Sequence, residues 1–297
     1  MRLYYGFVTL SAGWVGMVLY PGMVSRGSYV LLSVILFSCW GVNQIINDYF
    51  NLEEDKINAP GRPMACGKLN VRGAMAVSGG CIVGILIYSM WQNPAACVPI
   101  LAGVLANIFY SKTKNILLFA FSISCCAWFA YVVLGGGVGA FFTANSGQNA
   151  VLFLGLLGCN ALMTFFTYFK DVQVDKSVGK WTPQVIFGNE TMRKAGLVLG
   201  LLPWGVLVLV YLCTGWRAAL GVWLVGGILS ALTGYLFYKP HATQDDYFYL
   251  KYNFAACCVL QSGLVAWVNP LAGSWLALGC ALGVLSIFSG GYTHADE

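Results

Sequence analysis

The most regular feature of this sequence is a series of apolar stretches, each about twenty residues long, separated by short polar turns. A helix of about twenty apolar residues is long enough to cross the hydrocarbon core of a bilayer. The pattern therefore predicts about nine or ten transmembrane helices. We expect these spans at residues 3–20, 28–50, 74–91, 95–111, 115–134, 149–170, 194–214, 218–238, 251–268 and 271–290.

Composition indicates the same class of protein. The chain has 59% hydrophobic residues, 9% charged residues and a mean hydropathy of +0.73, which excludes an ordinary soluble domain and indicates a multi-pass integral membrane protein. We expect an all-α polytopic bundle that forms one domain over residues 1–297, because no long linker or charge block interrupts the pattern. The first stretch has no small-residue cleavage site soon after it, so we expect a retained span and not a signal peptide.

Positively charged residues gather on one side of this predicted topology. Cytoplasmic loops of membrane proteins carry an excess of Lys and Arg. With the spans given above, only Arg26 and Arg217 fall in loops on the opposite side. We therefore expect the N-terminus and the loops after the second, fourth, sixth and eighth spans to be cytoplasmic. Those loops hold Lys56, Arg62, Lys68, Arg72, Lys112, Lys114, Lys170, Lys176, Lys180, Arg193, Lys194, Lys239 and Lys251.

A first polar cluster lies where the second predicted span ends. Asn47, Asp48, Asn51 and Asp55 are spaced so that, on a helix, their side-chain oxygens share one face. Carboxylate and amide oxygens suit Mg²⁺, which keeps several waters and is commonly shared with substrate phosphates. The cluster therefore predicts a magnesium site. The alternative is an ordinary polar helix end, in which these residues only cap and solvate the helix.

A second, smaller cluster follows the sixth predicted span. Asp171 and Asp175 are one helical turn apart, and Lys176, Gly179 and Lys180 come directly after them. Two carboxylates beside lysines can form a simple surface ion network, so this spacing alone is weak evidence for a metal site. Its predicted position on the same membrane face as the first cluster strengthens the metal interpretation, because the two clusters can then converge.

Two cationic segments accompany the acidic clusters. Arg62 lies in the turn after the first cluster, and a guanidinium can hold phosphate oxygens in a bidentate fork. Tyr110, Lys112 and Lys114 lie in the loop after the fourth predicted span. These three could also be an interfacial tyrosine with ordinary cytoplasmic lysines. We interpret the group as a candidate diphosphate-binding site.

These segments together resemble the signatures of the UbiA-type intramembrane prenyltransferases. Residues 47–63 resemble the first signature, with Asn51 in place of the family's middle Asp, and that substitution removes one negative charge from the expected metal site. Residues 170–180 resemble the second signature, in which Asp171 and Asp175 take the acidic places. Residues 110–114 resemble the family's Tyr-Ser-x-x-Lys loop, with Lys112 or Lys114 as the equivalent lysine.

The resemblance covers the helix order over nearly the whole chain and implies a bundle of about nine helices around a central cavity that opens to lipid. It also implies that two Mg²⁺ ions bind an isoprenyl diphosphate between the two clusters. The implied metal ligands are Asn47, Asp48, Asn51, Asp55, Asp171 and Asp175. The implied catalytic residues are Asp48, Asp55, Asp171 and Asp175, and the implied diphosphate contacts are Arg62, Tyr110, Lys112 and Lys114.

The activity that this resemblance implies is Mg²⁺-dependent transfer of an isoprenyl group to a lipophilic acceptor within the membrane. We expect an aromatic acceptor, as in quinone or related lipid biosynthesis, and neither a nucleic-acid ligand nor an obligate protein partner. A membrane terpene cyclase of the same family is the first alternative, and the departure at Asn51 slightly favours it. A transporter is the second, although transporter acids are expected near the bilayer midplane and these acids lie at helix ends.

The remaining polar residues carry weaker signals. The eleven cysteines are scattered, mostly through apolar stretches, without zinc-ligand spacing, so we expect inert packing thiols. Asp245 and Asp246 precede the ninth predicted span, and we expect them to cap or solvate its start.

The predicted topology can be tested by cysteine accessibility. Single cysteines introduced as Lys68→Cys and Lys180→Cys should react with a membrane-impermeant thiol reagent only from the cytoplasmic side, because both positions lie in the loops rich in Lys and Arg. Modification only from the outside would contradict the orientation.

Overall fold

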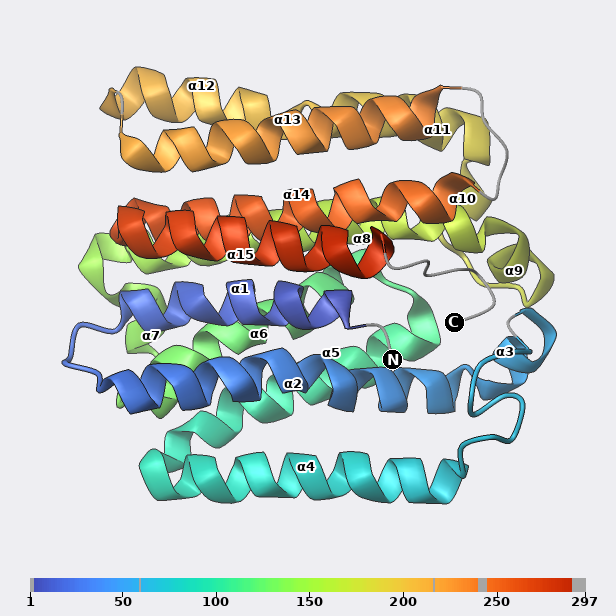
Figure 1. The fold of residues 1–297 in the computed structure, drawn as a ribbon, viewed down its shortest axis with the longest axis horizontal. Coiled ribbons are helices and arrows are strands. Elements are labelled where there is room, and N and C mark those ends of the chain that lie inside the picture. The colour runs from blue at the N-terminus through green and yellow to red at the C-terminus, as the bar shows by residue number, and fades with distance from the viewer. Residues whose placement is uncertain (1–2, 59, 216, 240–244, 290–297) are drawn as a thin grey trace. The chain divides into compact units, whose positions relative to one another are not determined.

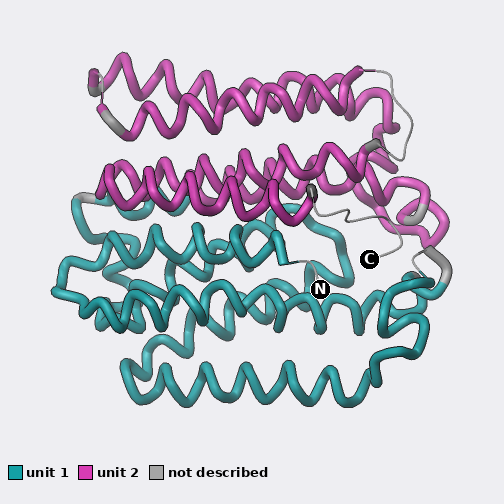
Figure 2. The backbone as a smooth tube through the Cα atoms, viewed as in Figure 1, with its two compact units in different colours: residues 1–154, 292–297 teal, residues 155–291 magenta. Residues whose placement is uncertain are grey.

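The computed structural model describes residues 3–58, 60–215, 217–239 and 245–289, and every regular element within these ranges is a helix (Figure 1). The all-α fold predicted from the sequence is confirmed. Contacts divide the chain into two compact units, residues 1–154 and residues 155–291 (Figure 2). The single domain expected over residues 1–297 stays a prediction.

The first unit contains the helices that carry the first polar cluster and the Tyr110 loop. Side-chain caps mark the starts of three of its long helices: Ser25, Asn70 and Asn115 each accept a hydrogen bond from a backbone N–H in the first turn. The elements are α1 (Tyr4–Leu19), α2 (Arg26–Phe50), α3 (Leu52–Asn58), α4 (Val71–Gln92), η1 (Pro94–Ala96), α5 (Cys97–Thr113), α6 (Ile116–Val133), α7 (Ala140–Thr143), η2 (Asn145–Gly147) and α8 (Gln148–Thr167), which continues into the second unit.

Packing in the first unit is organised around α1. This helix contacts both α2 and α6, while α5 packs on α6 and α4 packs on α2. Glycines allow the close approach, since a Cβ at Gly13 would overlap the side chain of Leu36 on α2 and a Cβ at Gly16 would overlap the carbonyl of Ala127 on α6. The outer helix α4 instead exposes Val77, as expected for a surface that faces lipid.

The second unit carries the second acidic cluster. Helix α14 packs between α13 and α15, and α11 packs against α13. A Cβ at Gly200 would lie 2.8 Å from the carbonyl oxygen of Ser230, so glycine brings these two backbones together. The elements are η3 (Tyr168–Asp171), α9 (Val172–Ser177), α10 (Pro183–Ile186), α11 (Asn189–Gly200), α12 (Leu202–Thr214), α13 (Ala218–Tyr238), α14 (Asp245–Val268) and α15 (Pro270–Ser289).

The predicted spans correspond to long helices in the structure. Among the described residues, eight helical stretches are long and apolar enough to cross a membrane, with α11 and α12 counted together as one stretch, and α1 is a shorter apolar helix of 16 residues. The span expected at 194–214 is divided into α11 and α12 just before Pro203, which cannot donate a backbone hydrogen bond inside a helix. The span expected to begin at residue 251 begins earlier, because α14 starts at Asp245.

The contact between α1 and α6 predicts a strong effect of Gly16→Ala. The added methyl group would overlap the Ala127 carbonyl, and backbone cannot turn aside as a flexible side chain can. We expect a loss of about 1–3 kcal/mol in stability, which thermal unfolding in detergent or nanodiscs measures as a lower midpoint. The matched control is Gly84→Ala on α4, where a Cβ meets nothing within 4 Å. An equal loss in both variants would contradict this explanation.

Candidate active site

The first polar cluster crosses a break between two helices. Helix α2 ends at Phe50, Asn51 has φ −102° and ψ 11°, and α3 begins at Leu52. The sequence predicted that these residues share one continuous helix. The structure corrects this prediction, because the helix is interrupted at Asn51. The strip nevertheless keeps helical spacing, because the N–H of Asn51 donates to Asn47 O at 3.0 Å and the N–H of Asp55 donates to Asn51 O at 2.8 Å.

Asn47 is the centre of a hydrogen-bond network that joins α2 to α5. Its Oδ1 accepts from Asn51 Nδ2 at 3.0 Å and from Ser111 Oγ at 3.0 Å. An amide oxygen has two lone pairs, so these two donors use its ordinary hydrogen-bonding capacity. Ser111 therefore fixes the end of α5 against the first cluster. The motif resemblance included Ser111, but the spacing of residues along the chain could not reveal this contact.

Asp48 is oriented by a residue one turn earlier on α2. Gln44 Nε2 donates a hydrogen bond to Asp48 Oδ1, and Gln44 is itself buried. Directly before Gln44, Asn43 accepts hydrogen bonds from Asn107 Nδ2 on α5, at 3.4 Å to both its backbone oxygen and its Oδ1. The polar face of α2 thus continues from the cluster toward the middle of the helix.

Asp55 and Arg62 form an ion pair at the far end of the first cluster. Arg62 NH1 donates to Asp55 Oδ1, and both side chains are largely buried. Arg62 Nε is buried without a hydrogen-bond partner among the described residues. Because a guanidinium presents several donors in a fixed fork, Arg62 can neutralise Asp55 and still donate to a phosphate oxygen.

The two lysines of the Tyr110 loop have different surroundings. Lys114 has a left-handed backbone conformation with φ 53°, and its Nζ lies 5.8 Å from the centroid of the Tyr110 ring. Lys112 is exposed, and its Nζ lies 5.6 Å from the centroid of the Phe50 ring at the end of α2. Lys114 therefore lies beside Tyr110, whereas Lys112 lies beside the end of the first cluster.

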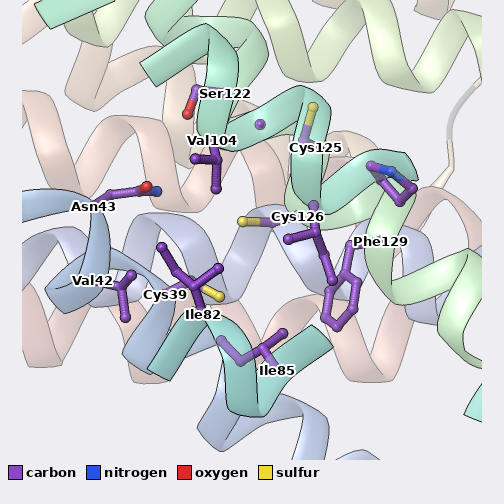
Figure 3. Close-up of a pocket in the computed structure, with 13 residues that line it drawn as sticks. Cys39, Val42, Asn43, Ile82, Ile85, Val104, Ser122, Cys125, Cys126 and Phe129 are labelled. Atoms are coloured by element: carbon purple, nitrogen blue, oxygen red, sulfur yellow. The ribbon is translucent and has the colours of Figure 1, made fainter. Parts of the chain in front are cut away.

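An apolar cavity of about 70 Å³ lies between α2, α4, α5 and α6, beyond the polar face of α2 (Figure 3). Asn43 and Ser122 are the polar members of its lining. The remaining lining side chains are hydrocarbon, aromatic or thiol groups, including Cys39, Cys126 and Phe129. Such a lining disfavours water. All eleven cysteines of the chain are free thiols.

The second cluster lies on the short helices that follow α8. Lys170 Nζ forms an ion pair of 2.8 Å with Asp171 Oδ1, and only 7% of the Lys170 side chain is exposed. Asp175 is buried, and its carbonyl accepts a hydrogen bond from the N–H of Lys180 at 2.8 Å. Gly179 has φ +70° in this turn, a conformation that favours glycine. The loop after the second cluster thus closes back onto Asp175.

A buried ion pair between α11 and α14 lies beside the second cluster. Arg193 NH2 on α11 donates to Asp246 Oδ1 at 3.0 Å and to Asp246 Oδ2 at 2.8 Å, and Arg193 NH1 donates to Phe237 O at 2.6 Å. The Arg193 guanidinium also lies 5.2 Å from the centroid of the Phe169 ring, one residue before Lys170. The sequence predicted that Asp246 would cap or solvate a helix start. Asp246 does lie in the first turn of α14, but it is not solvated, because it is 0% exposed and pairs with a cation 53 positions away.

The oxygen donors of both clusters fit Mg²⁺. Within the described part of the chain, no three His, Cys, Asp or Glu side chains gather as a metal site. This is compatible with magnesium, which typically binds one or two carboxylates and takes its other ligands from waters and substrate phosphates. Asp48 and Asp55 provide two carboxylates in the first unit, and Asp171 and Asp175 provide two in the second.

The Arg193–Asp246 pair predicts a large loss of stability when it is broken. Arg193→Ala leaves a fully buried carboxylate without its cation, which typically costs about 3–5 kcal/mol. Thermal unfolding should show this loss, and the double variant Arg193→Met/Asp246→Leu should recover most of it. The control is Lys194→Ala, which breaks the neighbouring but exposed pair with Glu190 and should leave the midpoint unchanged. No recovery in the double variant would show that the pair itself is not what stabilises this region.

Solved structures with the same fold cover nearly the whole chain. A UbiA homologue from Aeropyrum pernix K1 matches with a TM-score of 0.70 and 14% identity, over 90% of this chain and 98% of that one. A UbiA homologue from Archaeoglobus fulgidus, described as bound to GPP and Mg²⁺, matches with a TM-score of 0.59 and 16% identity, over 86% of this chain and 98% of that one.

Sequence relatives agree with the fold. The digeranylgeranylglyceryl phosphate synthase of Thermococcus sibiricus is 28% identical over 187 residues, which is 59% of this chain and 62% of that protein. The protein of the same name from Pyrococcus furiosus is 28% identical over 204 residues, or 64% of this chain and 69% of that protein. Residues 8–255 match the sequence pattern of the UbiA prenyltransferase family. This chain belongs to the UbiA prenyltransferase family.

Proposed function

We propose that this protein transfers an isoprenyl group from a prenyl diphosphate to a lipophilic acceptor within the membrane, with Mg²⁺ as cofactor. The observation that carries the proposal is the buried pair of Asn51 and Asp55 at the break between α2 and α3, with Arg62 paired to Asp55. Carboxylates and a guanidinium with a spare donor are the groups that a metal-bound diphosphate requires. Family membership supports the same reaction, as does the homologue described with bound GPP and Mg²⁺.

Each cluster would hold Mg²⁺ through its carboxylates. In this proposal Asp48 and Asp55 bind Mg²⁺ in the first unit, with Asn51 as an oxygen ligand, and Asp171 and Asp175 bind Mg²⁺ in the second unit. Asn47 remains a proposed ligand, although its Oδ1 already accepts two hydrogen bonds. Bound Mg²⁺ would supply neutralisation of the negative charge that develops on the departing diphosphate.

The diphosphate would be held by the cationic residues around the first cluster. Arg62 can donate through Nε while NH1 stays on Asp55. Tyr110 and Lys114 lie together at the end of α5, and we assign Lys114 as the lysine of that loop because its chain turns back over the Tyr110 ring. Lys112 would reinforce the positive potential beside Phe50. These donors would stabilise the leaving group more strongly as its charge grows.

The reaction breaks one bond and forms another. The bond between prenyl C1 and the diphosphate oxygen breaks with both electrons leaving on oxygen, and the acceptor forms a new bond to C1 and loses a proton. An allylic cation survives only where water is excluded. The aromatic and aliphatic side chains around α2 are suited to this, since Phe119 packs edge-on against Trp40 and lies beside Tyr110.

The acceptor that the comparisons favour is a glyceryl phosphate lipid. The named relatives are digeranylgeranylglyceryl phosphate synthases, and their product name indicates two isoprenoid chains on glyceryl phosphate. The matched segment spans 62% of the first of these proteins, so the acceptor comes to this chain as a proposal. The aromatic acceptor expected from the sequence has no such support and stays a prediction, as does the cytoplasmic position of the two clusters.

The proposed function predicts metal-dependent diphosphate release. Purified protein in nanodiscs, given geranylgeranyl diphosphate and a glyceryl phosphate lipid with one isoprenoid chain, should release diphosphate and form the doubly prenylated product only with Mg²⁺. Asp175→Ala should lower turnover by about 100-fold, because the metal loses a charged ligand. Glu53→Ala is the control, since it removes an exposed carboxylate near the first cluster and should change turnover little.

The products distinguish the remaining functions. Full activity in EDTA would contradict the metal mechanism, and cyclic hydrocarbons formed without acceptor would identify a terpene cyclase. Absence of diphosphate release under all these conditions would favour a transporter.

A further inference from the structure

Two buried polar atoms on α2 have no hydrogen-bond partner among the described residues, and both lie just beyond the first cluster. They are Gln44 Oε1 and Trp40 Nε1. Gln44 is 6% exposed and Trp40 is 5% exposed. Gln44 precedes Asp48 by one helical turn and Trp40 precedes Gln44 by another, so the three side chains follow one face of α2.

The orientation of the Gln44 amide is set by its neighbour. Its Nε2 donates to the Asp48 carboxylate. Rotating the amide by half a turn would place its oxygen against a carboxylate oxygen, and neither group could then donate. The Oε1 atom is therefore held as a free acceptor on the other side of the amide.

The orientation of the Trp40 indole is set by aromatic packing. Its ring stacks on Tyr5 of α1, with centroids 3.8 Å apart and an angle of 12° between the planes. The Phe119 ring of α6 packs edge-on against it at 5.8 Å. Between these two rings the indole has a fixed position, so its N–H stays a free donor.

Leaving such atoms unpaired is unfavourable, because each loses its bonds to water and gains none in return. The two orphans have opposite hydrogen-bonding character, since an amide oxygen only accepts and an indole N–H only donates. A hydroxyl complements both, because it donates through its proton and accepts through its oxygen. A carbonyl or ether would satisfy only Trp40, and an ammonium would satisfy only Gln44.

We propose that Gln44 and Trp40 bind the hydroxyl group of the prenyl acceptor and thereby select an alcohol as the nucleophile. The inference rests on the proposed function and specifies the acceptor side of that site. Gln44 and Trp40 lie one and two turns before Asp48 on α2, toward the apolar middle of that helix.

The chemistry balances without a further reactant. A lone pair of the hydroxyl oxygen forms the new C–O bond as the C1–diphosphate bond breaks, and the hydroxyl proton leaves on the diphosphate. Gln44 stays a neutral amide throughout and orients the O–H without taking its proton. The Trp40 N–H donates to the other lone pair of the hydroxyl oxygen, and its ring excludes water from the cation.

The test replaces the indole by a phenyl ring, which has no N–H. Trp40→Phe keeps an aromatic ring in the stack with Tyr5 and should raise KM for the alcohol acceptor about 5- to 10-fold, the effect of one lost hydrogen bond. KM for geranylgeranyl diphosphate and the Mg²⁺ concentration for half-maximal activity should not change. Trp128→Phe is the matched control, because it removes an indole N–H that donates to Val138 O at 3.1 Å elsewhere in the same unit.

A second measurement uses the ligand in place of the protein. A deoxy analogue of the acceptor, with hydrogen in place of the hydroxyl, should inhibit wild type and Trp40→Phe with equal Ki, because the contact is absent from both. In wild type, the analogue should bind at least about 10-fold more weakly than the alcohol, since two hydrogen bonds are lost. The comparison of the analogue with the alcohol uses wild-type protein alone, so it does not depend on the folding of a variant.

The outcomes separate the two proposals. Wild-type protein that releases no diphosphate would overturn the proposed function. Wild-type protein that transfers the prenyl group, but binds the deoxy analogue as tightly as the alcohol or shows an unchanged acceptor KM in Trp40→Phe, would overturn the hydroxyl site alone. Efficient prenylation of an acceptor carbon in a compound without a hydroxyl group would also overturn it.

Discussion

The pairing of buried charges is the constraint on which both acidic clusters depend. A carboxylate taken out of water is strongly destabilising unless a cation or several hydrogen-bond donors compensate it. The structure provides a cation for Asp55 from Arg62, for Asp171 from Lys170 and for Asp246 from Arg193. Charged groups can therefore remain at the ends of apolar helices, and the same pairing fixes their geometry.

Local pattern was enough to predict the helices and to select the residues of the clusters. The period of the apolar stretches predicts the helical class, because about twenty apolar residues leave few alternatives to a membrane helix. The spacing of Asn47, Asn51 and Asp55 survives in the structure even though the helix breaks at Asn51, since the backbone hydrogen bonds continue across the break. Short-range spacing is a property of the sequence and can be read from it.

Contacts between helices could not be read in this way. Ser111 reaches Asn47 across 64 positions, and Arg193 reaches Asp246 across 53 positions. Asp246 was expected to be solvated, because nothing near it in the sequence offers the buried guanidinium that it meets. Gln44 was equally inconspicuous within an apolar stretch, because its importance depends on which of its atoms finds a partner. The sequence thus identified groups that hold charge but not those that orient them.

The shortness of α1 has a consequence for how the protein meets its bilayer. Its 16 residues give a rise of about 24 Å, less than the hydrocarbon thickness of about 30 Å. A lipid-facing helix of that length would thin the surrounding bilayer. Most of α1 is buried against α2 and α6. The difference between its length and the bilayer thickness is therefore met by contacts with these helices and not by the lipid.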